Sequence, residues 1–236
     1  FGCVLANAAK NATISSVSVQ GDIQGSSSMG GLVGSATNST LTNTSFDGAI
    51  TSKQSGQSTF SIGGLVGELA GNESLISKSG VRVAISTESR NTNQRIGGIT
   101  GYLNTGAKIE DSTVTGSISA KESFSRIGGV IGSNYVNGGV KNVVSSVDVP
   151  NGYSITGDQY STNLIANNAV VEGTQSKLDR YAETITKAEA EERIQKMNSS
   201  NALTDAISTD KSNGNLFSVD YTNSVSYTHL TLPTIR

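Results

Sequence analysis

The sequence has very few of the residues that cross-link, anchor or catalyse. Its 236 residues include 1 Cys, 1 His, 2 Pro and no Trp, and aromatic residues make up only 5%. The single cysteine, Cys3, excludes an intramolecular disulfide framework, and no segment approaches the roughly 18 apolar residues that span a bilayer. The formal net charge is -2, and the Lys and Arg residues are scattered along the chain. The sequence therefore predicts neither nucleic-acid binding, which needs a basic stripe, nor membrane insertion.

Both ends of the sequence differ from those of an ordinary gene product. The chain opens at Phe1, without an initiator Met or a signal peptide, which predicts a fragment of a longer protein. Residues 225 to 236 resemble the in-frame translation of a transposase sequencing adapter, so we expect an adapter-derived artefact there. The only histidine, His229, and one of the two prolines, Pro233, fall in this stretch.

A repeat organises the rest of the chain. The pattern apolar-Gly-Gly-apolar-x-Gly begins at Met29, Ile62, Ile96 and Ile127, and successive copies are 33, 34 and 31 residues apart. Weaker copies are expected at residues 1 to 6 and 161 to 166. Six copies in all point to a repeat architecture.

A block of alternating apolar and polar residues comes after each glycine motif, which is the period-two signature of a half-buried strand. The apolar residues recur in columns, such as Ile14, Leu41, Ile76, Ile109 and Val140. Equivalent strands that stack at intervals of about 30 residues predict an all-β fold, a β-solenoid of about five repeats over residues 1 to 172. We expect it to resemble a right-handed parallel β-helix, because parallel crossovers are right-handed.

The motif glycines are expected to have a structural role. A residue without a Cβ atom can adopt a positive φ or allow a close approach between coils. The sequence lacks the Gly-Lys-Ser/Thr of a phosphate-binding loop, so no phosphate cofactor is predicted. The twelve structural glycines are Gly30, Gly31, Gly34, Gly63, Gly64, Gly67, Gly97, Gly98, Gly101, Gly128, Gly129 and Gly132.

The repeat pattern ends near residue 172, and residues 173 to 224 form a separate, non-repeat segment. Thr186 followed by Glu189 is a capping-box signature, and Ala190, Ile194 and Met197 come next at helical spacing. We expect one amphipathic helix over residues 187 to 197 and a strand over residues 216 to 221.

The sequence offers no catalytic or metal-binding constellation. One Cys and one His give no zinc ligand set, and the serines have no base beside them. Asp111 shares its column with Asn43 and Asn142, which is typical of a solvated corner. Tyr102 and Tyr135 come just after successive glycine motifs, so they are the candidate residues for an exposed binding surface.

The Gly-Gly-Leu-Val-Gly core with its trailing alternating block resembles the GLUG motif of bacterial exported proteins. Within that group, residues 1 to 172 are similar to the non-catalytic region of peptidase family M26, the immunoglobulin A1-cleaving zinc metallopeptidases. The zinc-binding motif of that family is absent from this sequence, so no catalytic residue is carried over. The resemblance implies a secreted or wall-attached protein of a Gram-positive bacterium, with further domains in the same polypeptide.

The sequence supports three functional hypotheses. The first is a non-catalytic repeat region that acts as a spacer or recognition scaffold. The second is the part of an M26-like metallopeptidase that gives it access to host immunoglobulin. The third is an adhesin module that binds a host protein or glycan. None of the three makes this chain an enzyme by itself.

Overall fold

The computed structural model describes most of the repeat region and part of the C-terminal segment. The described residues are 2, 5–53, 59–88, 93–120, 126–135, 137–158, 165–177, 180–201, 207–208 and 218–219. The expectations for Cys3 and for residues 225 to 236 lie outside these ranges. Of the strand expected at residues 216 to 221, only β22 (Ser218–Val219) is described, and it pairs antiparallel with β21 (Ile207–Ser208).

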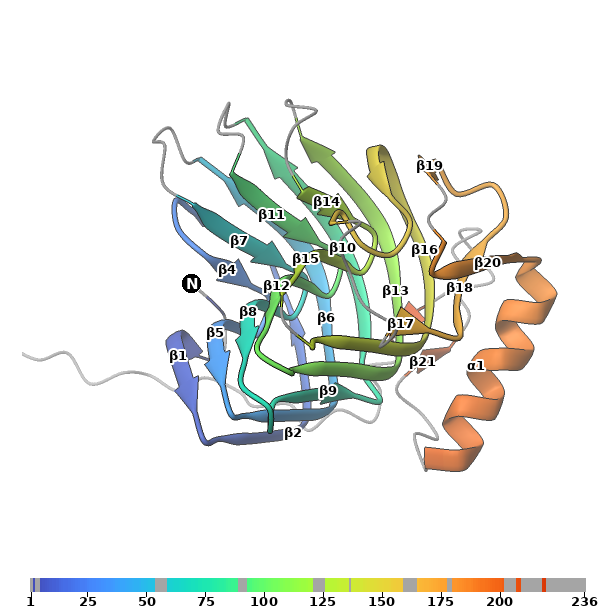
Figure 1. Cartoon of the computed structure of the whole chain (residues 1–236), viewed down its shortest axis with the longest axis horizontal. Coiled ribbons are helices and arrows are strands. Elements are labelled where there is room, and N and C mark those ends of the chain that lie inside the picture. Colours follow the sequence, from blue (N-terminus) through green and yellow to red (C-terminus); the bar gives the residue numbers. More distant parts are fainter. Residues whose placement is uncertain are drawn as a thin grey trace, which may run out of the picture.

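The fold is a β-solenoid of about five turns, as the sequence predicts, and its strands stack in parallel from coil to coil (Figure 1). Three faces line each coil. Sheet 1 is a separate sheet and contains β1 (Leu5–Lys10), β5 (Val33–Thr37), β8 (Val66–Ala70), β12 (Thr100–Asn104) and β15 (Ile131–Asn134).

The other two faces are joined through the long strand β16. Sheet 2 contains β4 (Met29–Gly30), β7 (Phe60–Gly63), β11 (Gln94–Gly97), β14 (Arg126–Gly128) and β19 (Ser176–Lys177). Sheet 3 contains β2 (Thr13–Gln20), β3 (Ile23–Gly25), β6 (Thr40–Ser52), β9 (Leu75–Ser77), β10 (Gly80–Thr87), β13 (Lys108–Ala120), β16 (Gly139–Tyr153), β17 (Ile165–Ala166), β18 (Asn168–Val171) and β20 (Ala182–Ile185).

The predicted apolar columns form the core. Leu41 pairs in register with both Ile14 and Ile76, and Ile109 pairs with both Ile76 and Val140. The other columns behave in the same way, with Val81 between Phe46 and Val114. All of these side chains except Ile14 are at most 2% exposed, so each coil covers the apolar side chains of its neighbour.

Sheet 3 bends at a column of left-handed residues, which explains the polar column that contains Asp111. These residues have φ angles between 48° and 57°, a conformation that Asn and Asp tolerate better than most residues. Asn142 Nδ2 donates a hydrogen bond of 2.7 Å to Asp111 Oδ1, so the corner side chains bond to one another. The column comprises Ser16, Asn43, Lys78, Asp111, Asn142 and Asn167.

The motif glycines are needed for close approach between coils. None of the twelve has a φ in the left-handed region. At Gly98, an added Cβ would overlap the carbonyl oxygen of Gly129 and lie 2.8 Å from Val114 Cγ2. The second glycine of each pair therefore lies directly against the middle column of the core, with no space for a side chain.

The sixth copy of the motif lies elsewhere than the sequence predicts. Ile165 pairs with Val140, so it belongs to the strand column rather than to a glycine motif at residues 161 to 166. Ile155 occupies the motif position instead: Val130 N donates to its carbonyl at 3.1 Å, as Leu65 N does to Ile99. The last coil is shorter than the others, so a constant repeat spacing predicts its motif too far along the chain.

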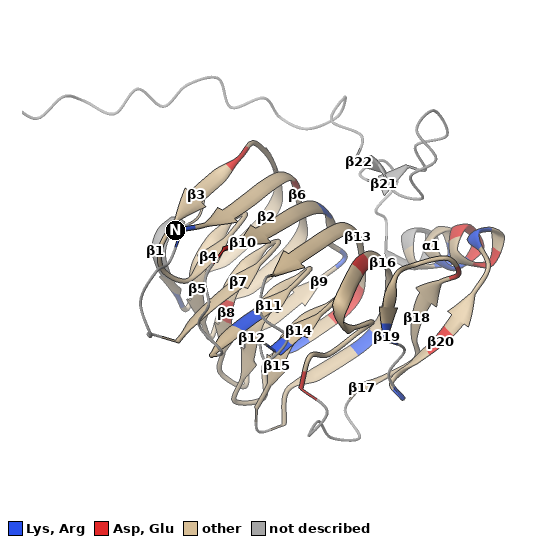
Figure 2. Ribbon diagram, turned by 90° about the horizontal axis from the view of Figure 1, so that it is seen from above, with Lys and Arg blue, Asp and Glu red and all other residues tan. Residues whose placement is uncertain are grey.

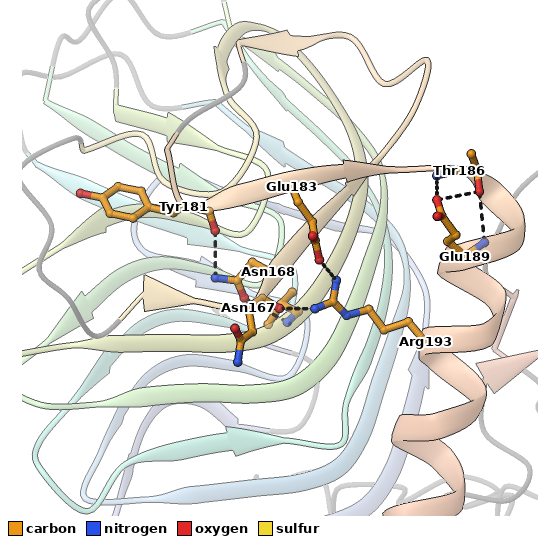
Figure 3. Close-up of polar contacts among 8 residues, drawn as sticks. Asn167, Asn168, Tyr181, Glu183, Thr186, Glu189 and Arg193 are labelled. Carbon is orange, nitrogen blue, oxygen red and sulfur yellow. Dashed lines mark hydrogen bonds and ion pairs between the residues drawn. The ribbon is translucent and has the colours of Figure 1, made fainter.

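In the last coils of the described solenoid, the outer face of sheet 3 is covered by α1 (Lys187–Asn201), which begins where the sequence predicts and continues past residue 197. Its apolar residues Ala190, Ile194 and Met197 pack against Val144 and Val171. Arg193 fixes the helix further, because it donates to Glu183 Oε1 at 2.7 Å and to the carbonyl oxygen of Asn167 at 2.9 Å (Figure 3). Within the described residues, no helix has the length and hydrophobicity that a membrane crossing requires.

Candidate functional site

The glycine motifs place charged and aromatic residues opposite one another. β11 ends at Gly97 and β12 begins at Thr100, so the chain reverses into the next sheet within two residues. The glycine after the turn packs on the preceding strand, and an added Cβ at Gly101 would lie 2.7 Å from the Arg95 carbonyl oxygen. Residues on either side of this tight arch therefore face each other. Arg95 and Tyr102 are such a pair, with the guanidinium carbon 3.7 Å from the centre of the ring.

The same positions line up from coil to coil and form a continuous polar strip, which we call the arch seam. On sheet 1, Tyr102 lies between Glu68 and Ser133 in register. On sheet 2, Arg95 lies in register with Arg126, and both strands lie side by side in Figure 2. The arch seam consists of Glu68, Arg95, Tyr102, Arg126, Ser133 and Asp158.

Asp158 belongs to the seam because of the short last coil. It comes directly after Gly157, whose added Cβ would lie 2.5 Å from the Arg126 carbonyl carbon, an equivalent position to that of Gly132 beside Arg95. Asp158 Oδ2 accepts a hydrogen bond of 3.1 Å from the Ser133 hydroxyl and lies 3.9 Å from Arg126 Nε. This carboxylate partly neutralises Arg126.

Arg95 has no such carboxylate among the described residues. Its Nε is buried without a hydrogen-bond partner, and its side chain makes no ion pair within the described part of the chain. A buried N–H that has lost its water without gaining an acceptor is unfavourable. The Tyr102 ring compensates in part through a cation–π contact. Arg95 therefore has unused hydrogen-bonding capacity next to a second arginine.

The two tyrosines predicted from the sequence lie on the same sheet, but their environments differ. Tyr135 lies just after β15 and is 59% exposed, and its backbone N–H bonds to the Leu103 carbonyl oxygen at 2.9 Å. Tyr102 is only partly exposed, because Arg95 lies over its ring. Burial raises the pKa of the Tyr102 hydroxyl, Arg95 opposes this, and the charges of Glu68 and Tyr135 add to it. Tyr102 stays a neutral hydrogen-bonding phenol at physiological pH.

Sequence reasoning missed the charged members of the seam. Arg95 and Arg126 stand one position before the apolar residue that opens their motif, and Tyr102 and Ser133 stand one position after its last glycine. That recurrent pair of flanking positions was the available signal. It was hard to interpret, because the types of residue at these positions change from repeat to repeat.

The arch seam has the chemistry of a binding surface. It offers two guanidinium groups, two hydroxyls, an aromatic ring and the carboxylates of Glu68 and Asp158. Among the described residues, no three His, Cys, Asp or Glu side chains lie close enough together to hold a metal ion. The Ser133 hydroxyl donates to the Asp158 carboxylate, which also lies 3.9 Å from Arg126 Nε, so this carboxylate is used in contacts within the seam.

A concave region of about 570 Å³ runs along α1 and is lined by its charged face, Asn142, Ile185 and Met197. Its charges are used within the protein. Arg193 bonds to Glu183 at 2.7 Å, and Lys196 bonds to Glu192 at 2.6 Å. Glu189 accepts hydrogen bonds from Thr186 (Figure 3). These contacts hold α1 in place, so we regard this concave region as part of the attachment of the helix to the solenoid.

Comparison with known proteins agrees with the repeat architecture. The family model "The GLUG motif" matches residues 25–51 and 92–119. The chain is 42% identical over 190 residues to the zinc metalloprotease ZmpC of Streptococcus pneumoniae, a match that covers 80% of this chain and 10% of that protein. It is 36% identical over 204 residues to an immunoglobulin A1 protease of Streptococcus sanguinis, covering 80% of this chain and 11% of that protein.

A solved structure has the same architecture. An IgA1 protease superposes with a TM-score of 0.67 and 26% sequence identity, over 82% of this chain and 18% of that one. The chain spans about a tenth of the length of the curated relatives that it matches. It is thus a GLUG-motif β-solenoid, homologous to a segment of the streptococcal zinc metalloproteases of the M26 type.

Proposed function

We propose that this solenoid is a non-catalytic recognition scaffold within an M26-like zinc metalloprotease. The observation that carries the proposal is the surface formed by Tyr135 and the arch seam. A largely exposed tyrosine follows β15 on sheet 1, and an arginine with no acidic partner among the described residues lies on β11 of sheet 2. Tyr and Arg are the residue types that contribute most binding energy at protein interfaces.

The relatives suggest the identity of the partner. Several are named immunoglobulin A1 proteases, so we propose that immunoglobulin A1 or a related host glycoprotein binds this face, and that the solenoid also acts as a spacer for the peptidase. A protein that acts on an immunoglobulin meets it outside the cell. We therefore also propose that the intact protein is secreted or attached to the cell wall.

The test is direct binding of the whole chain to immobilised immunoglobulin A1. Tyr135→Ala removes the exposed ring and should weaken binding by about tenfold, the effect of truncating an interface anchor. Lys141→Ala is the matched control, because Lys141 is an exposed strand residue on sheet 3, away from the seam. The proposal fails if the chain does not bind, or if both variants bind as the parent does.

A further inference from the structure

The arrangement of Arg95 and Arg126 favours the binding of an anion between them. The two residues are direct neighbours in register on parallel strands, which are about 4.8 Å apart. Like charges that lie directly opposite each other in a sheet are destabilising. A negative group between the two guanidiniums would remove this repulsion, whereas the isolated chain has to tolerate it.

The seam itself supplies too few acidic groups at this point. Asp158 lies 3.9 Å from Arg126 Nε and also accepts the Ser133 hydroxyl. Glu68 and Ser133 lie in register with Tyr102 on the two neighbouring strands of sheet 1. Within the described residues, no ion pair joins Glu68 to Arg95. Among the described residues, Arg95 is therefore the seam arginine without an acidic partner, and Arg126 is only partly neutralised.

Arg95 is also held in an orientation that suits a planar anion. Its guanidinium lies on the Tyr102 ring at 3.7 Å, which restricts rotation of the side chain. A stacked guanidinium presents its edge, and the edge carries the paired N–H groups that bind both oxygens of a carboxylate. Because the group is already ordered, little conformational entropy is lost on binding.

The surroundings favour a protein rather than a small ion as the source of the carboxylate. Tyr135 is 59% exposed close to the seam and offers an apolar surface beside the charge. A carboxylate side chain two residues away from an apolar one along an extended backbone lies on the same face as it, so such a pair would meet both features. Tyr and Arg together are typical of protein interfaces.

We propose that Arg95 and Arg126 form a receptor for the carboxylate side chains of an acidic segment of a partner protein, with Tyr135 contacting an apolar residue on the same face of that segment. This inference rests on the proposed recognition function and specifies its chemistry. Arg95 provides the free cation, Tyr102 orients it, and Arg126 adds charge.

The experiment uses the whole chain and two fluorescent peptides with blocked ends, one that repeats Glu-Ser-Tyr-Ser, so that Glu and Tyr share a face, and one in which Gln replaces every Glu. We expect the Glu peptide to bind at least about tenfold more tightly than the Gln peptide at low salt, and the difference to shrink as salt is raised. Arg95→Gln should abolish most of this preference. Lys141→Gln, the matched loss of an exposed positive charge, should change it less than about twofold.

Arg95→Lys separates charge from geometry. It keeps the positive charge but loses the planar paired donors, so it should retain only part of the preference. Thermal unfolding of each variant checks that the solenoid is intact, and Arg95→Lys is used for the comparison if Arg95→Gln unfolds.

Equal binding of the two peptides, or a preference that survives Arg95→Gln in a folded chain, would overturn the inference. So would a sulfated or sialylated oligosaccharide that binds in an Arg95-dependent manner when the Glu peptide does not. If the chain shows no preference for the Glu peptide but still binds immunoglobulin A1, the carboxylate receptor is rejected and the proposed recognition function stands. A clear peptide preference without immunoglobulin binding rejects only the proposed partner.

Discussion

Single residues in this solenoid are constrained by the neighbouring coil more than by their own segment. Gly98 has an ordinary φ, yet a Cβ there would overlap the Gly129 carbonyl oxygen one coil away. Gly64 has the same relation to Gly98 and Val81. The sequence suggested two reasons for these glycines, and the structure shows that close packing is the one that applies.

Replacement of Gly98 by valine is expected to be strongly destabilising. Three added carbons must displace the Gly129 backbone or the Val114 side chain, and overpacking of this kind costs at least about 2 kcal/mol. Urea denaturation of Gly98→Val measures the loss. Ala84→Val adds two methyl groups at an exposed strand position and should change the free energy of unfolding by less than about 0.5 kcal/mol. An unfolding midpoint for Gly98→Val equal to that of the parent would show that the assignment is wrong.

Ser145 is the polar exception in the middle column. It lies in register between Val114 and Val170, it is 1% exposed, and its hydroxyl has no hydrogen-bond partner among the described residues. Valine occupies the equivalent place beneath Gly98. Ser145→Val should therefore stabilise the chain by about 1 kcal/mol, since it removes an unsatisfied polar group and fills the column. A higher unfolding midpoint is the expected result, with the exposed Ser117→Val as control, and a lower midpoint would contradict it.

At the scale of elements, α1 lies where the outer face of sheet 3 changes from small or polar residues to apolar ones. The column Ser45, Gly80 and Thr113 is small or polar in the earlier coils, and its next member is Val144. Val144 is fully buried because α1 covers it. The capping box holds the start of this helix, since Glu189 accepts the Thr186 N–H at 2.8 Å and its hydroxyl at 2.9 Å.

These hydrogen bonds make the stability of α1 depend on pH. They lower the pKa of Glu189 from its ordinary value of 4.5. A carboxyl group with a lower pKa in the folded state stabilises above its unfolded pKa, and this contribution is lost as the pH falls through the folded pKa. Hydrogen-exchange protection of α1 should therefore exceed that of Glu189→Gln at about pH 6, and the difference should shrink as the pH falls below 4.5. A difference that does not shrink as the pH falls would contradict this role.

At the scale of the whole molecule, the coil is the unit of stability. Every pairing in the three faces is parallel and joins one coil to the next, so no coil depends on a partner distant in the stack. Such stacks gain stability with each repeat. Similar segments in relatives ten times longer are consistent with a module that retains its structure within different proteins.

Deletion of residues 64 to 97 removes one full coil and should leave a folded, shorter solenoid. The deletion joins Gly63 to Gly98, so the motif and the register of every remaining column are kept. We expect an unchanged β-type circular dichroism spectrum per residue and a lower melting temperature. Deletion of residues 64 to 80, about half a coil, is the control and should abolish cooperative unfolding because the columns no longer align.

The sequence by itself determined the coil. The apolar columns and the Gly-Gly pairs recur at nearly constant spacing, and the alternation along each strand determines which side chains point inward. The stacking of Leu41, Ile76 and Ile109 was therefore predictable from the sequence. The start of α1 was likewise predictable from its capping box. These features depend on neighbours along the chain or on a fixed repeat.

Only the tertiary structure determined which side chains of sheets 1 and 2 contact each other across the glycine turns. The stacking of Arg95 on Tyr102 depends on the tightness of the turn between β11 and β12. The position of Asp158 depends on a last coil that is shorter than the rest, which also displaced the sixth motif from residues 161 to 166. A contact between sheets is set by backbone geometry over a whole coil, and the length of a coil can vary without any change in the pattern of its strands.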